Sequence, residues 1–253
     1  MLNARLSTVA RIVILNLSVV QFVVAPFTAK ADVQFKLEES SITIRITGTI
    51  SEHDAKSVQE LIPELEHKSL ELWLVDSRGG DVFAAIAIGR IVRKYEGNIW
   101  VSGKCYSSCA LIFISGVRRD LLEDGELGLH RPYFASAPQN REVLEKQVPL
   151  MLSMVKSYVA EMGITDNFYQ LMVNTAPSQI VVYRSDSFNN SYSKIVPKID
   201  PIYDEILAAR KAREFGITTS EARKRESEAD RCKLKGLSDS AVRRRASTRM
   251  HRL

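Results

Sequence analysis

Two side chains in this sequence have the types and the order of a nucleophile and its base. Ser107 lies in a turn of small residues, Gly103 to Ala110, with an apolar run on each side. His130 follows in a short strand-like segment. A serine hydroxyl attacks a carbonyl carbon only when a base takes its proton, and neutral imidazole suits that task near pH 7. The pair therefore predicts acyl-transfer chemistry.

This chemistry also needs backbone N–H groups to hold the negative charge that develops on the substrate oxygen. Gly79 and Gly80 lie between a predicted strand and a predicted helix, where the backbone can approach a ligand closely. We expect one N–H from Gly80 and another from Ser108, directly after the candidate nucleophile. No metal site is predicted, because too few thiols or imidazoles lie together, and we expect no cofactor.

The order of predicted elements indicates how these residues meet. Apolar and polar periodicity predicts strands and helices in alternation, with a loop at 116–119. This alternation predicts an α/β fold with parallel strands, whose carboxyl ends gather the reactive loops. The predicted strands are 41–48, 70–75, 98–101, 126–132 and 180–183, and the predicted helices are 51–65, 82–92, 107–114, 141–162, 165–172 and a polar stretch from 203 onward.

The ordered motifs resemble those of the proteolytic subunit of Clp protease, within the crotonase-like superfamily. They are Asp76-Ser77-Arg78-Gly79-Gly80-Asp81, Gly103-x-x-x-Ser107-x-x-Ala110, Ser115-Gly116 and His130-Arg131-Pro132. The resemblance covers about residues 40–175, and the Cys105-x-Ser107-x-Cys109 version is similar to a group of exported Clp-like proteins.

The resemblance implies a spiral of ββα units with mostly parallel strands, assembled into homo-oligomers. It also implies a serine peptidase that acts on peptides or proteins, with Ser107 as nucleophile, His130 as base, and oxyanion N–H groups at Gly80 and Ser108. The family places a third residue, an aspartate, just before a later strand. Here that neighbourhood reads Ala176-Pro177-Ser178-Gln179, and Asp186 follows out of register.

The first 31 residues are typical of an export signal. Arg5 and Arg11 precede the apolar run Ile12 to Val24, and Ala29-Lys30-Ala31 supplies a small-x-small cleavage pattern. We expect cleavage near Ala31 and a periplasmic or secreted protein. The alternative is a chain that stays anchored through an uncleaved N-terminal segment.

Charge divides the remaining chain. Residues 32–206, the expected globular domain, carry 18 basic and 24 acidic residues, a net charge of −6. Residues 207–253 carry 14 and 6, a net charge of +8, and form a basic tail that is either helical or disordered. Such a tail suits an anionic surface or protein. Arg243-Arg244-Arg245 has no aromatic residues among it, so we expect no specific nucleic acid.

Three cysteines allow at most one intramolecular pair, and Cys105 and Cys109 are the natural candidates by spacing. Cys232 remains, and free thiols are the alternative for all three. Two other functions compete with a peptidase. One is a catalytically impaired scaffold that binds partners through its basic tail, and the other is an acyl-CoA enzyme, which export disfavours.

Overall fold

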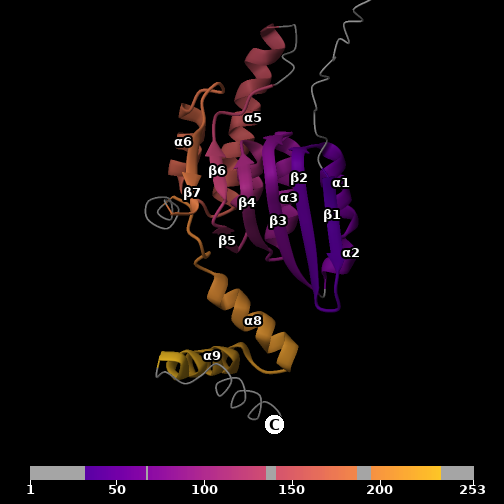
Figure 1. Ribbon diagram of the computed structural model, residues 1–253, viewed down its shortest axis with the longest axis vertical. Coiled ribbons are helices and arrows are strands. Elements are labelled where there is room, and N and C mark those ends of the chain that lie inside the picture. The colour runs from indigo at the N-terminus through magenta and orange to yellow at the C-terminus, as the bar shows by residue number, and fades with distance from the viewer. Residues whose placement is uncertain (1–31, 67, 135–140, 187–194, 235–253) are drawn as a thin grey trace, which may run out of the picture.

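The computed structural model describes residues 32–66, 68–134, 141–186 and 195–234. The expected signal segment and its cleavage site lie outside these residues, as does the end of the basic tail. A seven-stranded sheet forms the centre of the molecule, with helices packed on it (Figure 1).

The sheet is mostly parallel, as predicted. The five inner strands, β2 to β6, pair with one another in parallel. The two edge strands, β1 and β7, pair antiparallel with β2 and β6. The order is β1-β2-β3-β4-β6-β7, and β5 also pairs with β4. The strands are β1 (Asp32–Leu37), β2 (Ser41–Ile50), β3 (Ser69–Gly80), β4 (Asn98–Tyr106), β5 (Arg118–Leu121), β6 (Glu126–Leu129) and β7 (Val181–Arg184).

The helices follow the predicted alternation. Ser51 opens the first of them through a capping box with Asp54, whose carboxylate accepts the Ser51 N–H at 2.7 Å. Asp81 caps the third by accepting the Ala84 N–H at 2.9 Å. The helices are α1 (Glu52–Glu60), α2 (Ile62–Leu65), α3 (Val82–Lys94), α4 (Ser108–Phe113), α5 (Arg141–Glu161), α6 (Asp166–Asn174), α8 (Tyr203–Phe215) and α9 (Thr219–Leu234).

Strand periodicity builds the core. Ile42, Ile44 and Ile46 alternate along β2 and are fully buried, while the residues between them face outward. Helix α4 differs, because every one of its residues is buried. It packs against both α3 and the strands β3 and β4. The turn that precedes α4 is therefore held by the centre of the core.

Three parts of the sheet differ from the sequence prediction. β1 was not predicted, although Val33, Phe35 and Leu37 alternate with polar residues as a strand requires. The glycine segment forms the end of β3 rather than a loop. Residues 116–119 were predicted as a loop, but β5 begins at Arg118, because Trp100 and the rest of β4 offer a parallel edge for pairing.

An ionic cluster ties the segment before α8 to the sheet. The Arg119 side chain is fully buried and donates to the carbonyls of Ile114 and Pro197, at 3.0 and 2.8 Å. Its remaining guanidinium nitrogen lies 3.3 Å from the buried Asp200 carboxylate, which Arg93 also approaches at 2.8 Å. The single Asp200 carboxylate therefore pairs with two guanidinium groups.

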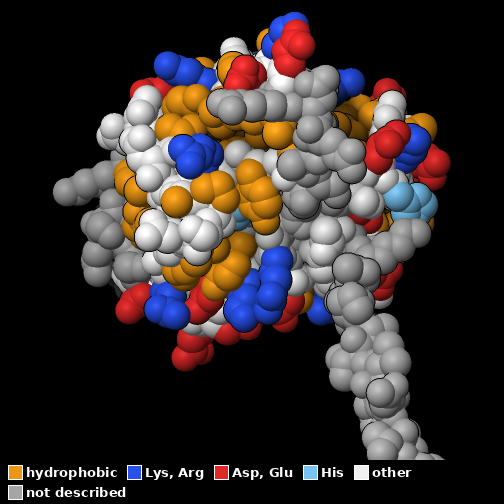
Figure 2. Space-filling view, turned by 90° about the horizontal axis from the view of Figure 1, so that it is seen from above, with side chains coloured by type: hydrophobic (Ala, Val, Ile, Leu, Met, Phe, Trp, Pro, Cys, Tyr) orange, Lys and Arg blue, Asp and Glu red, His pale blue; other side chains and the backbone are white. Residues whose placement is uncertain are grey.

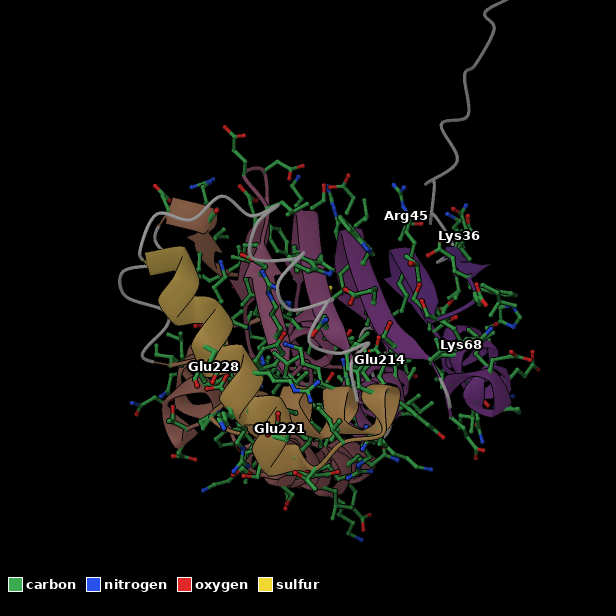
Figure 3. All side chains as sticks on the ribbon, turned by 90° about the horizontal axis from the view of Figure 1, so that it is seen from below. Lys36, Arg45, Lys68, Glu214, Glu221 and Glu228 are labelled. Carbon is green, nitrogen blue, oxygen red and sulfur yellow. A yellow bond between two sulfur atoms is a disulfide. The ribbon has the colours of Figure 1, made fainter. Side chains whose placement is uncertain are left out.

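Helices α8 and α9 extend below the sheet (Figure 1) and carry many charged side chains (Figure 3). α8 spans the expected boundary between residues 206 and 207. Ala208, Ala212 and Ala222 form a small core between the two helices, with the partly buried Ile217 packed against it. Arg210 connects α8 to the body through the side chain and carbonyl of Glu96. In the described parts of the chain, no helix combines the length and hydrophobicity that a membrane span needs.

Tyr158 joins α5 to α4. Its hydroxyl donates to the Leu111 carbonyl at 2.9 Å inside the core. A Cβ on Gly89 of α3 would lie 1.8 Å from that hydroxyl oxygen. Because glycine has no side chain, Gly89 leaves the space that the Tyr158 hydroxyl occupies next to α4.

Candidate active site

Ser107 occupies the junction between β4 and α4. Its backbone has φ of 57°, one of three positive values at non-glycine positions in the described residues, with Asp76 and Glu96. Positive φ is costly for a residue with a Cβ, so the surrounding structure must enforce it. A strained turn between a strand and a helix is a typical place for a nucleophilic serine.

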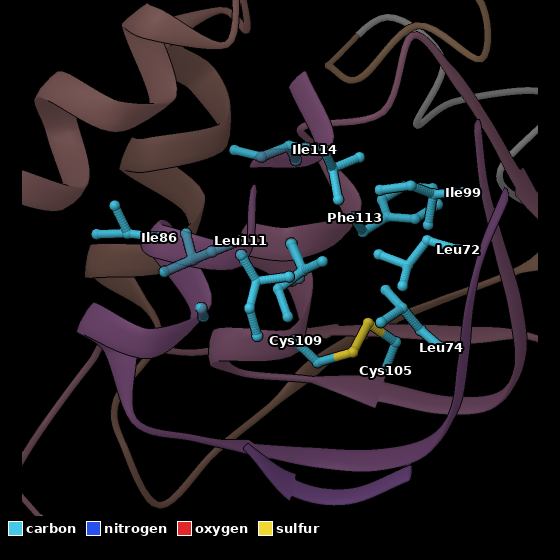
Figure 4. Packing of buried hydrophobic residues seen from close by; sticks show 14 of the residues in the cluster. Leu72, Leu74, Ile86, Ile99, Cys105, Cys109, Leu111, Phe113 and Ile114 are labelled. Atoms are coloured by element: carbon cyan, nitrogen blue, oxygen red, sulfur yellow. A yellow bond between two sulfur atoms is a disulfide. The ribbon is translucent and has the colours of Figure 1, made fainter. Parts of the chain in front are cut away.

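A disulfide spans this turn, as the spacing predicted. Cys105 at the end of β4 and Cys109 in α4 are both buried, with Cα atoms 5.2 Å apart. Figure 4 shows the bond among the hydrophobic side chains of the core, close to Leu74. The bond joins the strand to the helix on either side of Ser107. Both ends of the turn are therefore anchored in the core.

The end of β6 lies beside Ser107. β4 and β6 are parallel, with Tyr106 opposite Gly128, and the Ser107 N–H donates to the Gly128 carbonyl at 2.9 Å. His130 follows Gly128 by two residues, just beyond the carboxyl end of β6. The two predicted catalytic residues thus lie at the same end of neighbouring strands.

The glycine pair approaches the same turn from β3. A Cβ on Gly79 would lie 2.7 Å from the Ser107 Cβ and 3.0 Å from the Ser108 nitrogen. Gly80 instead packs on β2, where an added Cβ would lie 2.1 Å from the Ile50 carbonyl oxygen. The Ile50 carbonyl oxygen accepts a hydrogen bond from the Asp81 N–H at 2.9 Å. The close contact between Gly79 and Ser107 was not predicted from the sequence.

Ser108 has a buried side chain whose hydroxyl finds no hydrogen-bond partner among the described residues. Its backbone nitrogen is the one that faces Gly79. The main chain of Ser108, rather than its hydroxyl, is therefore the part that lies next to both the glycine segment and Ser107.

His130 contacts main chain rather than a carboxylate. Its Nδ1 lies 3.0 Å from the Arg131 carbonyl oxygen, and its ring centroid lies 5.8 Å from that of Tyr133. The Arg131 N–H donates in turn to the Thr175 carbonyl at 2.8 Å. Among the described residues, no carboxylate accepts a hydrogen bond from this imidazole. The residues after Thr175, Ala176 to Gln179, supply no acid either.

Asp186 lies at the wrong end of the sheet to contact His130. β6 and β7 are antiparallel, with Leu129 opposite Val181 and Glu126 opposite Arg184. Asp186 follows Arg184 and so extends past the Glu126 end of β6. Four residues of strand, about 13 Å, separate that level from His130. The strand register thus explains why Asp186 does not complete a triad.

A polar cluster next to Ser107 was missed in the sequence. The Tyr106 hydroxyl donates to the Glu126 carboxylate, which Arg184 also approaches at 2.9 Å. Burial and the hydrogen bond to Glu126 raise the pKa of Tyr106 to about 12. The residues come from β4, β6 and β7, so only strand pairing, which the sequence does not display, brings them together.

Exposed hydrophobic side chains border this end of the sheet. Phe83 lies in the first turn of α3, Tyr133 follows His130, and Ile180 precedes β7, and each is at least 40% exposed. Figure 2 looks onto the end of the molecule from which α5 rises and shows hydrophobic side chains gathered there. Within the described residues, no group of three or more side chains is arranged to hold a metal ion.

The family described as Clp protease matches residues 29–167, more than half of the chain. The chain belongs to the Clp protease family. This confirms the family expected from the motifs and the α/β fold with mostly parallel strands. No curated protein matches the chain. Among solved structures, this Clp protease family member is similar to a mutant ClpP1 from Listeria monocytogenes, at 18% identity and a TM-score of 0.47, over 58% of this chain and 85% of that one.

Proposed function

We propose that this Clp protease family member is an exported serine peptidase that cleaves peptides or proteins through an acyl-enzyme at Ser107. The observation that carries the proposal is the turn at Ser107, which has positive φ, is anchored by a disulfide, and meets the end of β6 and the glycine segment. Such a turn presents a serine side chain while strand and helix hold its backbone.

The proposed reaction uses His130 and two backbone donors. The Ser107 Oγ forms a bond to the substrate carbonyl carbon while His130 takes its proton. The N–H groups of Gly80 and Ser108 hold the oxyanion. The C–N bond then breaks, the amine leaves with the proton from His130, and water hydrolyses the ester. The hydrophobic residues Phe83 and Tyr133 suit a peptide substrate.

A fluorophosphonate probe tests this function, because the activated Oγ displaces fluoride and forms a stable bond to phosphorus. We expect the oxidised protein to be labelled at Ser107, and Ser107→Ala to abolish labelling. Ser108→Ala is the matched control and should retain most of it, because only its main chain is proposed to act. Labelling that persists in Ser107→Ala, or is absent in the native protein, would contradict the proposal.

Export is supported by the disulfide as well as by the expected signal, because disulfides persist in oxidising compartments. We expect the full chain, expressed in a bacterium with an intact secretion pathway, to be recovered outside the cytoplasm with an N-terminus near Asp32. N-terminal sequencing of that fraction measures this. A chain that retains residues 1–31 in the membrane fraction would instead support anchoring.

A second candidate function is a non-catalytic interaction protein on the same fold. The observation that favours it is the absence of a carboxylate in contact with His130 among the described residues. In this case the basic residues 207–253 would bind an anionic partner. Two variants distinguish these functions. A scaffold should lose its effect when residues 207–253 are deleted and keep it in Ser107→Ala, whereas a peptidase requires the Ser107 hydroxyl.

A further inference from the structure

We propose that the main-chain carbonyl of Arg131 does for His130 what a carboxylate does in a complete triad. This carbonyl holds the imidazole in the tautomer with its proton on Nδ1, and that tautomer leaves Nε2 free to accept a proton. The proposal rests on the proposed function for the role of His130 as base, but its central test does not depend on activity.

The contact itself determines where the proton lies. A carbonyl oxygen only accepts hydrogen bonds, and the His130 Nδ1 lies 3.0 Å from that of Arg131. If Nδ1 carried no proton, two lone pairs would face each other at this distance. The neutral ring therefore carries its proton on Nδ1, and the lone pair is on Nε2. A general base that acts on serine needs this tautomer.

The carbonyl is held in place from both sides of its residue. The Arg131 N–H donates to the Thr175 carbonyl at 2.8 Å. Thr175 is 7% exposed, and its hydroxyl donates to the Leu171 carbonyl at 2.8 Å, which anchors it to the end of α6. On the other side, the buried Pro132 restricts the backbone. The orienting group is thus part of a braced main-chain segment.

This arrangement accounts for a site without an acid. In the best-studied triad, aspartate-to-asparagine replacement lowers kcat about 10⁴-fold because the histidine takes the wrong tautomer. A carbonyl avoids that loss, because it accepts from Nδ1 as a carboxylate does. It does not supply the negative charge that stabilises the imidazolium, so the site should be slower than a full triad. The segment after α6, which lacks the acid, contributes through the Thr175 carbonyl instead.

The first test is ¹⁵N NMR of the full oxidised protein with labelled histidines, at about pH 9, where an ordinary imidazole is neutral. We expect a protonated Nδ1 and an unprotonated Nε2 for His130, identified by the signals that His130→Gln removes. The exposed His53 on α1 is the internal reference for an unconstrained ring. A His130 with its proton on Nε2, or exchanging between both nitrogens, would overturn the proposal.

A pair of variants tests the hydrogen bond from the Arg131 N–H to the Thr175 carbonyl, which holds the Arg131 main chain in place. Arg131→Pro removes the N–H that bonds Thr175, so His130 should lose its fixed tautomer and fluorophosphonate labelling should slow at least tenfold. Arg131→Ala keeps both main-chain contacts and controls for loss of the side chain, so it should slow labelling less than Arg131→Pro does. Equal behaviour of the two folded variants would contradict the proposal, and the native spectrum decides if Arg131→Pro does not fold. A native protein with the expected tautomer but no labelling would refute the peptidase function and leave this inference intact.

Discussion

Asp200→Asn is expected to lower the free energy of unfolding by about 3–5 kcal/mol at pH 7. Asparagine keeps the size of the side chain but removes the carboxylate charge that lies 3.3 Å from the fully buried Arg119. An uncompensated buried charge is among the most destabilising changes that one substitution can make. Urea denaturation followed by circular dichroism measures the loss. Asp204→Asn, at an exposed position on α8, is the control and should change stability by less than about 0.5 kcal/mol.

The effect should also depend on pH. Burial opposes ionisation, but the Ile202 N–H and the Arg93 and Arg119 cations prevail and hold the pKa of Asp200 below its usual range. A carboxyl group with a lowered pKa stabilises the fold above its unfolded value of about 3.9 and loses that contribution as the pH falls through the folded value. The difference between native and Asp200→Asn proteins should therefore shrink in acid. A difference that stays constant from neutral pH down to about pH 2 would contradict the ionic role.

Gly79→Ala is expected to slow fluorophosphonate labelling of Ser107 by at least about 10²-fold. The new Cβ would lie 2.7 Å from both the Ser107 Cβ and the Tyr106 carbonyl oxygen, and Gly79 has φ of 93°. The turn must shift to relieve these contacts, and Ser107 shifts with it. The rate constant of labelling, with the melting temperature of the same sample, measures the effect.

Gly163→Ala is the matched control for backbone strain. Gly163 also has positive φ, 70°, but an added Cβ would meet only an Arg93 nitrogen at 3.9 Å. This variant should lose about 1 kcal/mol of stability and label at the native rate. Equal labelling of Gly79→Ala and Gly163→Ala would show that contact between Gly79 and Ser107 does not set the geometry of the site.

Local patterns were sufficient for most of the fold. Alternation along 41–48 predicted β2, and Ser51 and Asp81 marked helix starts by chemistry that acts within a few residues. The spacing of Cys105 and Cys109 indicated the disulfide for the same reason. β1 was missed because its alternating residues directly follow the expected signal segment, although their pattern is clear.

What the sequence did not disclose depends on strand register. The contact of Gly79 with Ser107, and the bond from Arg131 to Thr175, join residues whose separation along the chain carries no local signal. The absence of an acid in Ala176–Gln179 was evident in the sequence. That a carbonyl contacts His130 instead required the path of the backbone after β6.

The Tyr158 contact has a mechanical consequence. α4 begins directly after Ser107, and its Leu111 carbonyl receives the hydroxyl of a residue near the end of the 21-residue helix α5. A buried tyrosine in a close-packed core moves little independently of its helix. A displacement of the outer part of α5 would therefore be transmitted to α4, the helix that begins directly after Ser107. A partner that binds α5 would therefore influence the position of Ser107.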